Sequence, residues 1–261
     1  MDLIQTIILG LIQGVTEWLP ISSTGHLRLT EHFWNLKVPI LFDVLLHAGT
    51  LIVTLFFFRK DIKNILVALA KRDFKTENGK LIPLIIVGTV PTALIGVFFG
   101  SVIEAFFSSL LPIAGAFAIC GVALFSSKIG NESKTSIGYL EALIIGIAQG
   151  IAIIPGLSRS GLTIAVALLL GIKREKAFKF SFLLSVPAVI GALGLTFYTQ
   201  HDALTLAGVE WTEILIGVAV SAVIGYFALR LLRRIVADKK FFFFSFYCWL
   251  LSIVLTVLSL I

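Results

Sequence analysis

QGVTEWLPISSTGHL, residues 13–27, places a glutamate, a histidine, a proline and several hydroxyl side chains inside an otherwise apolar segment. A similar stretch, QGIAIIPGLSRSGLT, occupies residues 149–163 and carries an arginine. Irregular backbone at membrane depth is tolerated only where protein buries it or where it lines a water-filled cavity. The two stretches therefore predict a polar site inside an apolar fold.

The composition is that of a membrane protein. Of the 261 residues, 58% are hydrophobic and 14% are charged, and the mean hydropathy is +1.03, whereas soluble domains carry about 25% charged residues. Six apolar runs are long enough to cross a hydrocarbon core of about 30 Å. They are residues 38–58, 81–101, 107–126, 180–198, 211–232 and 241–261. We therefore predict an all-α polytopic membrane protein with six transmembrane helices.

The net charge of +6 does not indicate a nucleic-acid partner, because the basic residues cluster in short loops at the ends of the apolar runs, as topology signals do. Residues 59–80 carry seven lysines and arginines, whereas residues 199–210 carry none. Since the cytoplasmic side holds the excess, the first loop is predicted inside and the second outside. Cys120 and Cys248 lie within apolar runs without ligand-like spacing and are interpreted as packing residues.

Two related halves are visible in the sequence, residues 1–137 and 138–261. A shift of 136 residues superimposes the two polar stretches quoted above. A further match pairs VGTVPTALIGVFF at residues 87–99 with IGVAVSAVIGYFA at residues 216–228. Internal similarity of this kind is the signature of a repeat architecture.

The loop charges predict that the two halves have opposite orientations. Counting spans from the basic loop places residues 138–172 between two cytoplasmic ends, so this segment is predicted to enter and leave on one side as a re-entrant hairpin of two half-helices. Residues 1–36 are predicted to form the corresponding hairpin from the outer side. Each half is then a re-entrant hairpin followed by three spans. The two turns would meet near the midplane, and paired broken helices of this kind indicate a binding site.

Each turn presents hydroxyl side chains immediately before a new helix, where they are suited to N-cap positions. The amide groups and the dipole at a helix N-terminus attract anions, so two such ends facing each other predict a site for a multiply charged anion. Arg159 adds a planar fork suited to bidentate phosphate contact. The residues predicted to bind a phosphate-bearing substrate are Ser22, Thr24, Gly25, Ser158, Ser160, Gly161 and Thr163. Capping alone is the alternative role for the serines.

Gln13 and Glu17 are four residues apart, so on a regular helix both side chains lie on one face. A carboxylate at membrane depth is unfavourable unless it is paired. A divalent cation, Mg²⁺ or Ca²⁺, bound by these two side chains would supply the partner and would draw charge from a phosphoryl group. His26 is suited to act as base, acid or nucleophile. Interhelical hydrogen bonding is the alternative role for Gln13 and the favoured one for Gln149.

The polar stretches resemble a known family. QGVTEWLPISSTGH and PGLSRSGLT look like the two signature motifs of the undecaprenyl pyrophosphate phosphatases of the bacitracin-resistance type, and FDVLLHAGTLIV with FRKDI resembles that family's next segment. The resemblance implies hydrolysis of undecaprenyl pyrophosphate to undecaprenyl phosphate and inorganic phosphate, a divalent-cation requirement, and a site opening to the outer face of the bacterial plasma membrane. It also implies that the essential positions are Gln13, Glu17, Ser23, His26 and Arg159. The first of these is often glutamate in the family, and glutamine brings no second negative charge to a metal.

Several assignments stay open at the level of sequence. Either Ser23, with His26 or Glu17 as its base, or His26 itself is the nucleophile, and we favour Ser23. Asp43 and His47 either support the site or lie at the membrane interface. A secondary transporter shares this type of inverted repeat, and flipping of the product lipid is compatible with it, but the ionisable and hydroxyl groups at the turns favour an enzyme. The glycines of the matched segments permit close helix contacts within the chain or in a homo-oligomer.

Overall fold

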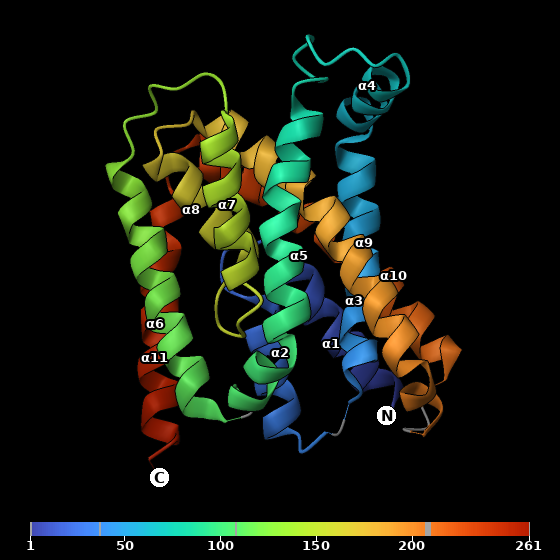
Figure 1. The fold of residues 1–261 in the computed structure, drawn as a ribbon. Coiled ribbons are helices and arrows are strands. Elements are labelled where there is room, and N and C mark those ends of the chain that lie inside the picture. Colours follow the sequence, from blue (N-terminus) through green and yellow to red (C-terminus); the bar gives the residue numbers. More distant parts are fainter. Residues whose placement is uncertain (1, 37, 108, 207–209, 261) are drawn as a thin grey trace.

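The computed structural model describes residues 2–36, 38–107, 109–206 and 210–260, which form a bundle of helices (Figure 1). Six helices in these ranges are long and apolar enough to cross a membrane, which confirms the prediction of an all-α polytopic membrane protein. They are α3 (Ile40–Phe57), α5 (Leu81–Phe106), α6 (Leu110–Ser126), α9 (Arg174–Leu206), α10 (Trp211–Ala237) and α11 (Phe244–Leu258). Parts of the predicted segments lie outside the described residues, namely the end positions 1 and 261, residue 108 of the third span and residues 207–209 of the outer loop.

The observed spans differ from the predicted ones mainly at their ends. α9 begins at Arg174 rather than at residue 180, because the charged side chains of REKAFKF are good helix formers and continue the helix beyond its apolar run. The same helix extends past residue 198 and contains a non-helical residue at Gln200. The last span opens with a 3-10 turn, Phe241–Phe243, before α11 begins. Hydropathy thus finds the apolar length of a helix and misses the polar turns that extend it.

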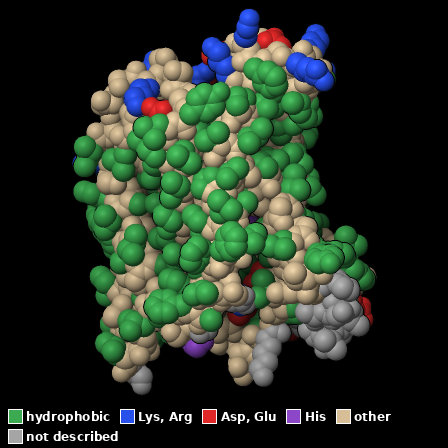
Figure 2. All heavy atoms as spheres, viewed as in Figure 1, with side chains coloured by type: hydrophobic (Ala, Val, Ile, Leu, Met, Phe, Trp, Pro, Cys, Tyr) green, Lys and Arg blue, Asp and Glu red, His purple; other side chains and the backbone are tan. Residues whose placement is uncertain are grey.

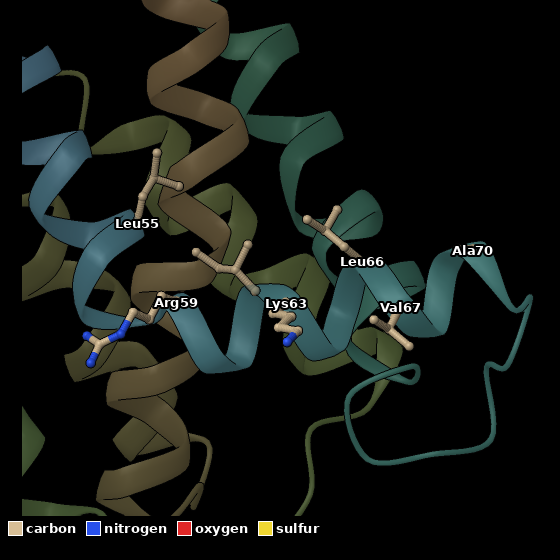
Figure 3. A pocket seen from close by; sticks show the side chains of 7 residues that line it. Leu55, Arg59, Lys63, Leu66, Val67 and Ala70 are labelled. Carbon is tan, nitrogen blue, oxygen red and sulfur yellow. The ribbon is translucent and has the colours of Figure 1, made fainter.

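The segment predicted as a basic loop contains a further helix, α4 (Arg59–Ala70). A groove of about 420 Å³ lies along α4 and the end of α3 (Figure 3). In Figure 3 the charged ends of Arg59 and Lys63 point away from the apolar side chain of Leu66. Among the described residues, no carboxylate or hydroxyl side chain lines this groove. It therefore lacks the groups that phosphate chemistry requires.

Four shorter helices form two hairpins. The first hairpin consists of α1 (Leu3–Thr16) and α2 (Ser23–Phe33), and the second of α7 (Tyr139–Ile151) and α8 (Arg159–Leu169). In Figure 1, α7 and α8 lie toward the end of the bundle that carries α4, whereas α1 and α2 lie toward the opposite end, near both chain termini. Re-entrant hairpins of opposite orientation would be arranged in this way. Their re-entry into a bilayer stays a prediction.

Charged side chains distinguish the two ends of the bundle. Figure 2 shows lysine and arginine side chains gathered at the end that carries α4, next to a flank covered by hydrophobic side chains. By the positive-inside rule this is the end predicted to be cytoplasmic. The hairpin of α1 and α2 would then lie on the outer side, as the loop charges predict.

Corresponding glycines bring corresponding helices together in the two halves. α1 packs on α10, where a Cβ atom on Gly10 would lie 2.8 Å from the carbonyl oxygen of Gly217. α7 packs on α5, where a Cβ atom on Gly146 would lie 2.2 Å from the carbonyl oxygen of Gly88. The sequence repeat pairs Gly10 with Gly146 and Gly88 with Gly217. These close contacts are made within one chain and do not require an oligomer.

Replacing Gly146 by alanine should lower the thermal stability of the detergent-solubilised protein. The new Cβ atom would overlap three backbone atoms of Gly88, the nearest at 2.2 Å, and overpacking of this kind costs about 1–3 kcal/mol. Gly194→Ala in α9 is the control, because nothing lies within 4 Å of its Cβ position and alanine there should gain up to ~1 kcal/mol of helix propensity. Circular dichroism during heating measures both changes. Equal melting temperatures for the two variants would contradict the assigned packing.

Candidate active site

The carboxylate of Glu17 lies at the centre of the site, where α1 ends. This buried side chain accepts hydrogen bonds from the hydroxyl of Ser23 at 2.6 Å and from the amide nitrogen of Gln13 at 3.1 Å. The guanidinium of Arg159 forms an ion pair with the other carboxylate oxygen, and His47 Nε2 lies 3.3 Å from Glu17 Oε2. These partners come from α1, α2, α3 and α8. The site is therefore complete only when both hairpins are in place.

Ser22 fastens the two turns to each other. Its hydroxyl accepts a hydrogen bond from the backbone amide of Gly25, 3.2 Å away in its own helix, and another from the amide of Gly156, 3.0 Å away in the opposite turn. Ser22 has a φ of 68°, in the left-handed region that residues other than glycine adopt rarely. Backbone of this kind persists only where surrounding contacts hold it. The repeat predicts that the two turns meet, and in the structure the hydrogen bond from Gly156 to Ser22 joins them.

Two helices begin at these turns. α2 begins at Ser23, and α8 begins at Arg159, where Ser158 caps the helix by accepting a hydrogen bond from the amide of Gly161 at 3.1 Å. The first amide groups of any helix have no acceptor within that helix. Because the turns are in contact, the site combines two helix N-termini, each with free donors and the positive end of a dipole. That combination suits an anion with several charges.

Two predicted substrate-binding hydroxyls are engaged in packing between helices. Ser160 donates to the backbone carbonyl of Trp18 at 3.2 Å, across the contact between the turns. Thr163 is fully buried, donates to the carbonyl of Arg159 at 2.7 Å, and is hydrogen-bonded to the hydroxyl of Ser181. These contacts explain both side chains without a substrate, so their predicted binding role stays untested.

The two glycines predicted at the site allow the turns to approach closely. A Cβ atom on Gly25 would lie 3.0 Å from the backbone nitrogen of Gly156, and one on Gly161 would lie 3.1 Å from Cβ of Pro20. Thr24, by contrast, lines an open cavity next to the turns. Of these three residues, Thr24 is the one whose side chain can reach a bound molecule.

His26 is held on another face of the turn. Its Nδ1 lies 2.7 Å from the backbone carbonyl of Ser22, and since a carbonyl only accepts, Nδ1 is the donor. Its Nε2 is hydrogen-bonded to the hydroxyl of Tyr247 in α11 at 2.7 Å, and the two rings are stacked. Both ring nitrogens therefore have partners other than Glu17 and the Ser23 hydroxyl. This geometry makes Glu17 the nearer base for Ser23.

The residues predicted to hold a divalent cation do not fit that role in the structure. The charge of Glu17 is already neutralised by Arg159, and Gln13 turns its amide nitrogen toward the carboxylate. The oxygen of Gln13 is buried without a hydrogen-bond partner, but it is a single neutral ligand. Within the described ranges, no group of three or more His, Cys, Asp or Glu side chains is placed to hold a metal. No reaction step is therefore assigned to a cation at Glu17, and the cofactor prediction stays untested.

A cavity of about 530 Å³ adjoins the turns. Residues of α2, α3, α5 and α9 line it, and it reaches Pro155 in the second turn as well as Thr24 and His47. The part between α2 and α3 is lined by Arg28, Glu31 and Asp43. This cavity therefore connects a set of charged side chains with the residues around Glu17.

The structure resolves several roles that the sequence leaves open. His47 belongs to the site through its contact with Glu17. Gln149 donates to the hydroxyl of Thr92 at 3.2 Å and to the carbonyl of Leu184 at 3.4 Å, which confirms its prediction as an interhelical hydrogen-bonding residue. Glu31 was not anticipated. A signal existed, because Glu31 lies seven residues after Thr24 and thus on the same helical face.

The two cysteines are buried and unpaired, as expected of packing residues. Both thiols also approach the first turn, with Cys120 Sγ at 4.0 Å and Cys248 Sγ at 3.8 Å from the backbone carbonyl of Pro20. The helices α6 and α11 that carry them pack against each other. The helices α6 and α11 therefore pack next to the first turn, with both thiols beside the carbonyl of Pro20.

The sequence matches the family described as Bacitracin resistance protein BacA over residues 6–254. The chain belongs to the BacA family. Three relatives are each named undecaprenyl-diphosphatase. The protein of Carboxydothermus hydrogenoformans is 42% identical over 99% of this chain and 98% of its own length, that of Halothermothrix orenii is 40% identical over 99% of each chain, and that of Treponema denticola is 41% identical over 95% and 94%.

The BacA match covers α1 from residue 6 onward and all of α2, α7 and α8, and with them Gln13, Ser23, His47 and Arg159, which contact Glu17. The family assignment therefore rests on nearly the whole chain rather than on a single motif. The individual roles of Ser23, His26 and Arg159 stay predictions from the sequence and the geometry.

Proposed function

We propose that this protein is an undecaprenyl-diphosphatase. It hydrolyses undecaprenyl diphosphate to undecaprenyl phosphate and inorganic phosphate, which recycles the lipid carrier of cell-wall synthesis in the bacterial plasma membrane and gives resistance to bacitracin. Membership of the BacA family and the names of the full-length relatives support the activity. The observation that carries the chemistry is the 2.6 Å hydrogen bond from the Ser23 hydroxyl to Glu17, at the meeting point of two helix N-termini.

In this mechanism Ser23 Oγ attacks the terminal phosphorus of the diphosphate. The proton of Ser23 passes to Glu17, which already accepts its hydrogen bond. The bond between the terminal phosphorus and the bridging oxygen breaks, and undecaprenyl phosphate leaves. Glu17 passes this proton to the departing undecaprenyl phosphate and so becomes a carboxylate again. It then takes a proton from water as that water attacks the phosphoserine, and returns it to Ser23 Oγ as the phosphorus–oxygen bond breaks to release inorganic phosphate. The two steps together consume one water molecule.

The diphosphate is bound by the groups that face it from both halves. Arg159 offers a planar guanidinium for two phosphate oxygens, and the first amides of α2 and α8 offer further donors. Arg159 is paired with Glu17 in the described structure. Binding of the diphosphate would draw the guanidinium toward the phosphate oxygens, and this would leave Glu17 free to accept the serine proton.

The substrate enters from the outer face of the membrane. The cavity next to the turns is lined by the end of α2 and the start of α3, which lie at the end of the bundle away from the basic helix α4 (Figure 1). If the basic end is cytoplasmic, the cavity opens outward. A long prenyl chain would then remain among lipid tails while its diphosphate head reaches the turns.

Phosphate release from a purified sample tests the function. Protein in detergent, supplied with undecaprenyl diphosphate, should release one inorganic phosphate per lipid, measured by a colorimetric phosphate assay. Glu17→Ala should lose on the order of 10³-fold or more of this activity, because the base is removed. Glu132→Ala, which removes a carboxylate paired with Arg174 away from the turns, is the control. A secondary transporter or flippase would bind or move the lipid without releasing phosphate, and that result would reject the proposal.

A further inference from the structure

Two carboxylates face each other in the cavity next to the turns. The side chains of Glu31 in α2 and Asp43 in α3 line the cavity and lie within hydrogen-bonding reach of each other. Their exposed fractions are 5% and 6%. Oε1 of Glu31 and Oδ1 of Asp43 are buried and have no hydrogen-bond partner. Two adjacent carboxylates thus each retain a buried oxygen without a hydrogen-bond partner.

This arrangement requires a positive partner. Arg28 Nη1 lies 3.4 Å from the second oxygen of Glu31 and is also close enough to Asp43 to attract its carboxylate, so a single guanidinium faces two carboxylates. His32 and His47 also line the cavity, and His47 is directed to Glu17 rather than to Asp43's carboxylate. Like charges in contact at low dielectric repel strongly. A proton shared between the carboxylates, or a cation bound by both, would remove the repulsion.

The surroundings favour a cation that is completed by the substrate. Mg²⁺ is commonly bound through one or two carboxylates together with waters and substrate phosphates, so a protein cage of three or more ligands is not needed. The same cavity is lined by the two carboxylates, by Thr24 beside the turns and by His47, which lies four residues after Asp43 on α3 and contacts Glu17. A diphosphate bound at the turns would therefore present its oxygens to the same cavity.

We propose that Glu31 and Asp43 bind a divalent cation, Mg²⁺ or Ca²⁺, whose coordination is completed by water and by the diphosphate of the substrate. The inference rests on the proposed function for the identity of that diphosphate. It assigns the cation to a position beside Glu17 rather than on it, since the Glu17 carboxylate is occupied in the structure by Arg159, Ser23 and Gln13. Here the cation offsets the negative charge of the diphosphate, while Glu17 stays free to accept the serine proton.

Manganese binding tests the site without turnover. The full-length protein in detergent is titrated with Mn²⁺ in the presence of methylenediphosphonate, a diphosphate analogue that is not hydrolysed, and free Mn²⁺ is measured by electron paramagnetic resonance. Wild-type protein should bind one Mn²⁺ per chain. Glu31→Gln and Asp43→Asn should each weaken binding at least about tenfold, because each removes one of two charged ligands. Asp61→Asn is the matched control, since its carboxylate pairs with Lys179 far from the cavity.

Glu17→Gln separates the proposed site from one at the catalytic carboxylate. This variant should lose phosphatase activity and keep Mn²⁺ binding. Loss of Mn²⁺ binding in Glu17→Gln, with binding retained in Asp43→Asn, would overturn the inference. Unchanged Mn²⁺ binding in both Glu31→Gln and Asp43→Asn would overturn it as well, and would indicate a shared proton.

A measurement on the wild-type protein covers the case in which a variant does not fold. Fe²⁺ replaces the cation, and ascorbate with peroxide then cleaves the backbone near the bound metal. Fragments identified by mass spectrometry should end close to residues 31 and 43. Cleavage confined to residues 13–17, or no specific cleavage, would contradict the site. Phosphate release by the untreated enzyme is measured separately, so failure of the proposed function and failure of the cation site give different results.

Discussion

Replacing Arg159 by glutamine should abolish phosphate release and destabilise the fold. The guanidinium is the cationic partner of the buried Glu17 carboxylate and the planar donor available to the diphosphate. Its loss leaves an uncompensated buried charge, which costs about 3–5 kcal/mol. It also removes donors aimed at the transferring phosphoryl group, where a single lost donor reduces the rate by about 10²–10³-fold. Thermal unfolding and a phosphate assay measure the two effects.

A double variant separates the two roles of Arg159. In Glu17→Gln/Arg159→Gln neither charge remains, so most of the lost stability should return while activity stays absent. Lys176→Gln is the control, because Lys176 forms an ion pair of 3.2 Å with Glu77 in which the two side chains are 40% and 86% exposed, and exposed pairs contribute about 1 kcal/mol or less. A double variant as unstable as Arg159→Gln alone would show that the ion pair is not what holds the two turns together.

The spans could be predicted because the bilayer sets the length of an apolar helix, and composition records that length directly. The basic segment after α3 was interpreted as a loop and forms α4. Its charges indicate topology, and the same residues, RKDIKNILVALA, also have good helix propensity. The basic residues were used to predict topology, and the helix propensity of the same segment was therefore overlooked. Local sequence was sufficient where one physical constraint acts alone, and failed where two act on the same residues.

The turns and the glutamate could be predicted because their residue types are costly inside a membrane. The spacing of Gln13 and Glu17 gave their shared face, and the structure has the hydrogen bond between them. The partners of His26 could not be found in this way. Tyr247 is 221 residues away from His26 in the chain. It belongs to a span whose sequence predicts only an apolar transmembrane helix. Contacts of this kind depend on how whole helices pack, which a pattern within one segment does not specify.

The contact between the halves explains why a hydrolase is compatible with a fold type shared by transporters. A transporter needs its two halves to move relative to each other around the bound molecule. In this structure the halves are joined at the turns by the Arg159–Glu17 ion pair and by the hydrogen bond from Gly156 to Ser22. The hydrogen bond from Gly156 to Ser22 does not depend on Arg159, so it keeps the two turns together when a diphosphate draws the guanidinium away from Glu17. Preorganised positioning of this kind is what phosphoryl transfer requires.

Replacing Ser23 by alanine should eliminate turnover while leaving the diphosphate site in place. Removal of a nucleophile that acts together with its base reduces the rate by on the order of 10³-fold or more. Ser23 makes its hydrogen bond to Glu17, whereas the hydrogen bond that fastens the turns belongs to Ser22. Ser23→Ala should therefore keep its affinity for methylenediphosphonate, while the loss of a hydrogen bond to a buried carboxylate costs about 1.5–3 kcal/mol of stability. Ser22→Ala, the matched control, should lose stability, since an N-cap hydroxyl contributes about 1 kcal/mol.

The chemistry of the intermediate distinguishes the two candidate nucleophiles. If Ser23 attacks, brief incubation with substrate labelled at the terminal phosphorus should leave label on the protein as phosphoserine, which survives acid. If His26 attacks, the label would be phosphohistidine, which acid removes and mild base preserves. The structure favours the serine, because His26 Nε2 is hydrogen-bonded to Tyr247 whereas Ser23 Oγ lies 2.6 Å from its base. Acid-labile label that persists in Ser23→Ala would therefore transfer the nucleophilic role to His26 and leave Glu17 without the proton it is positioned to accept.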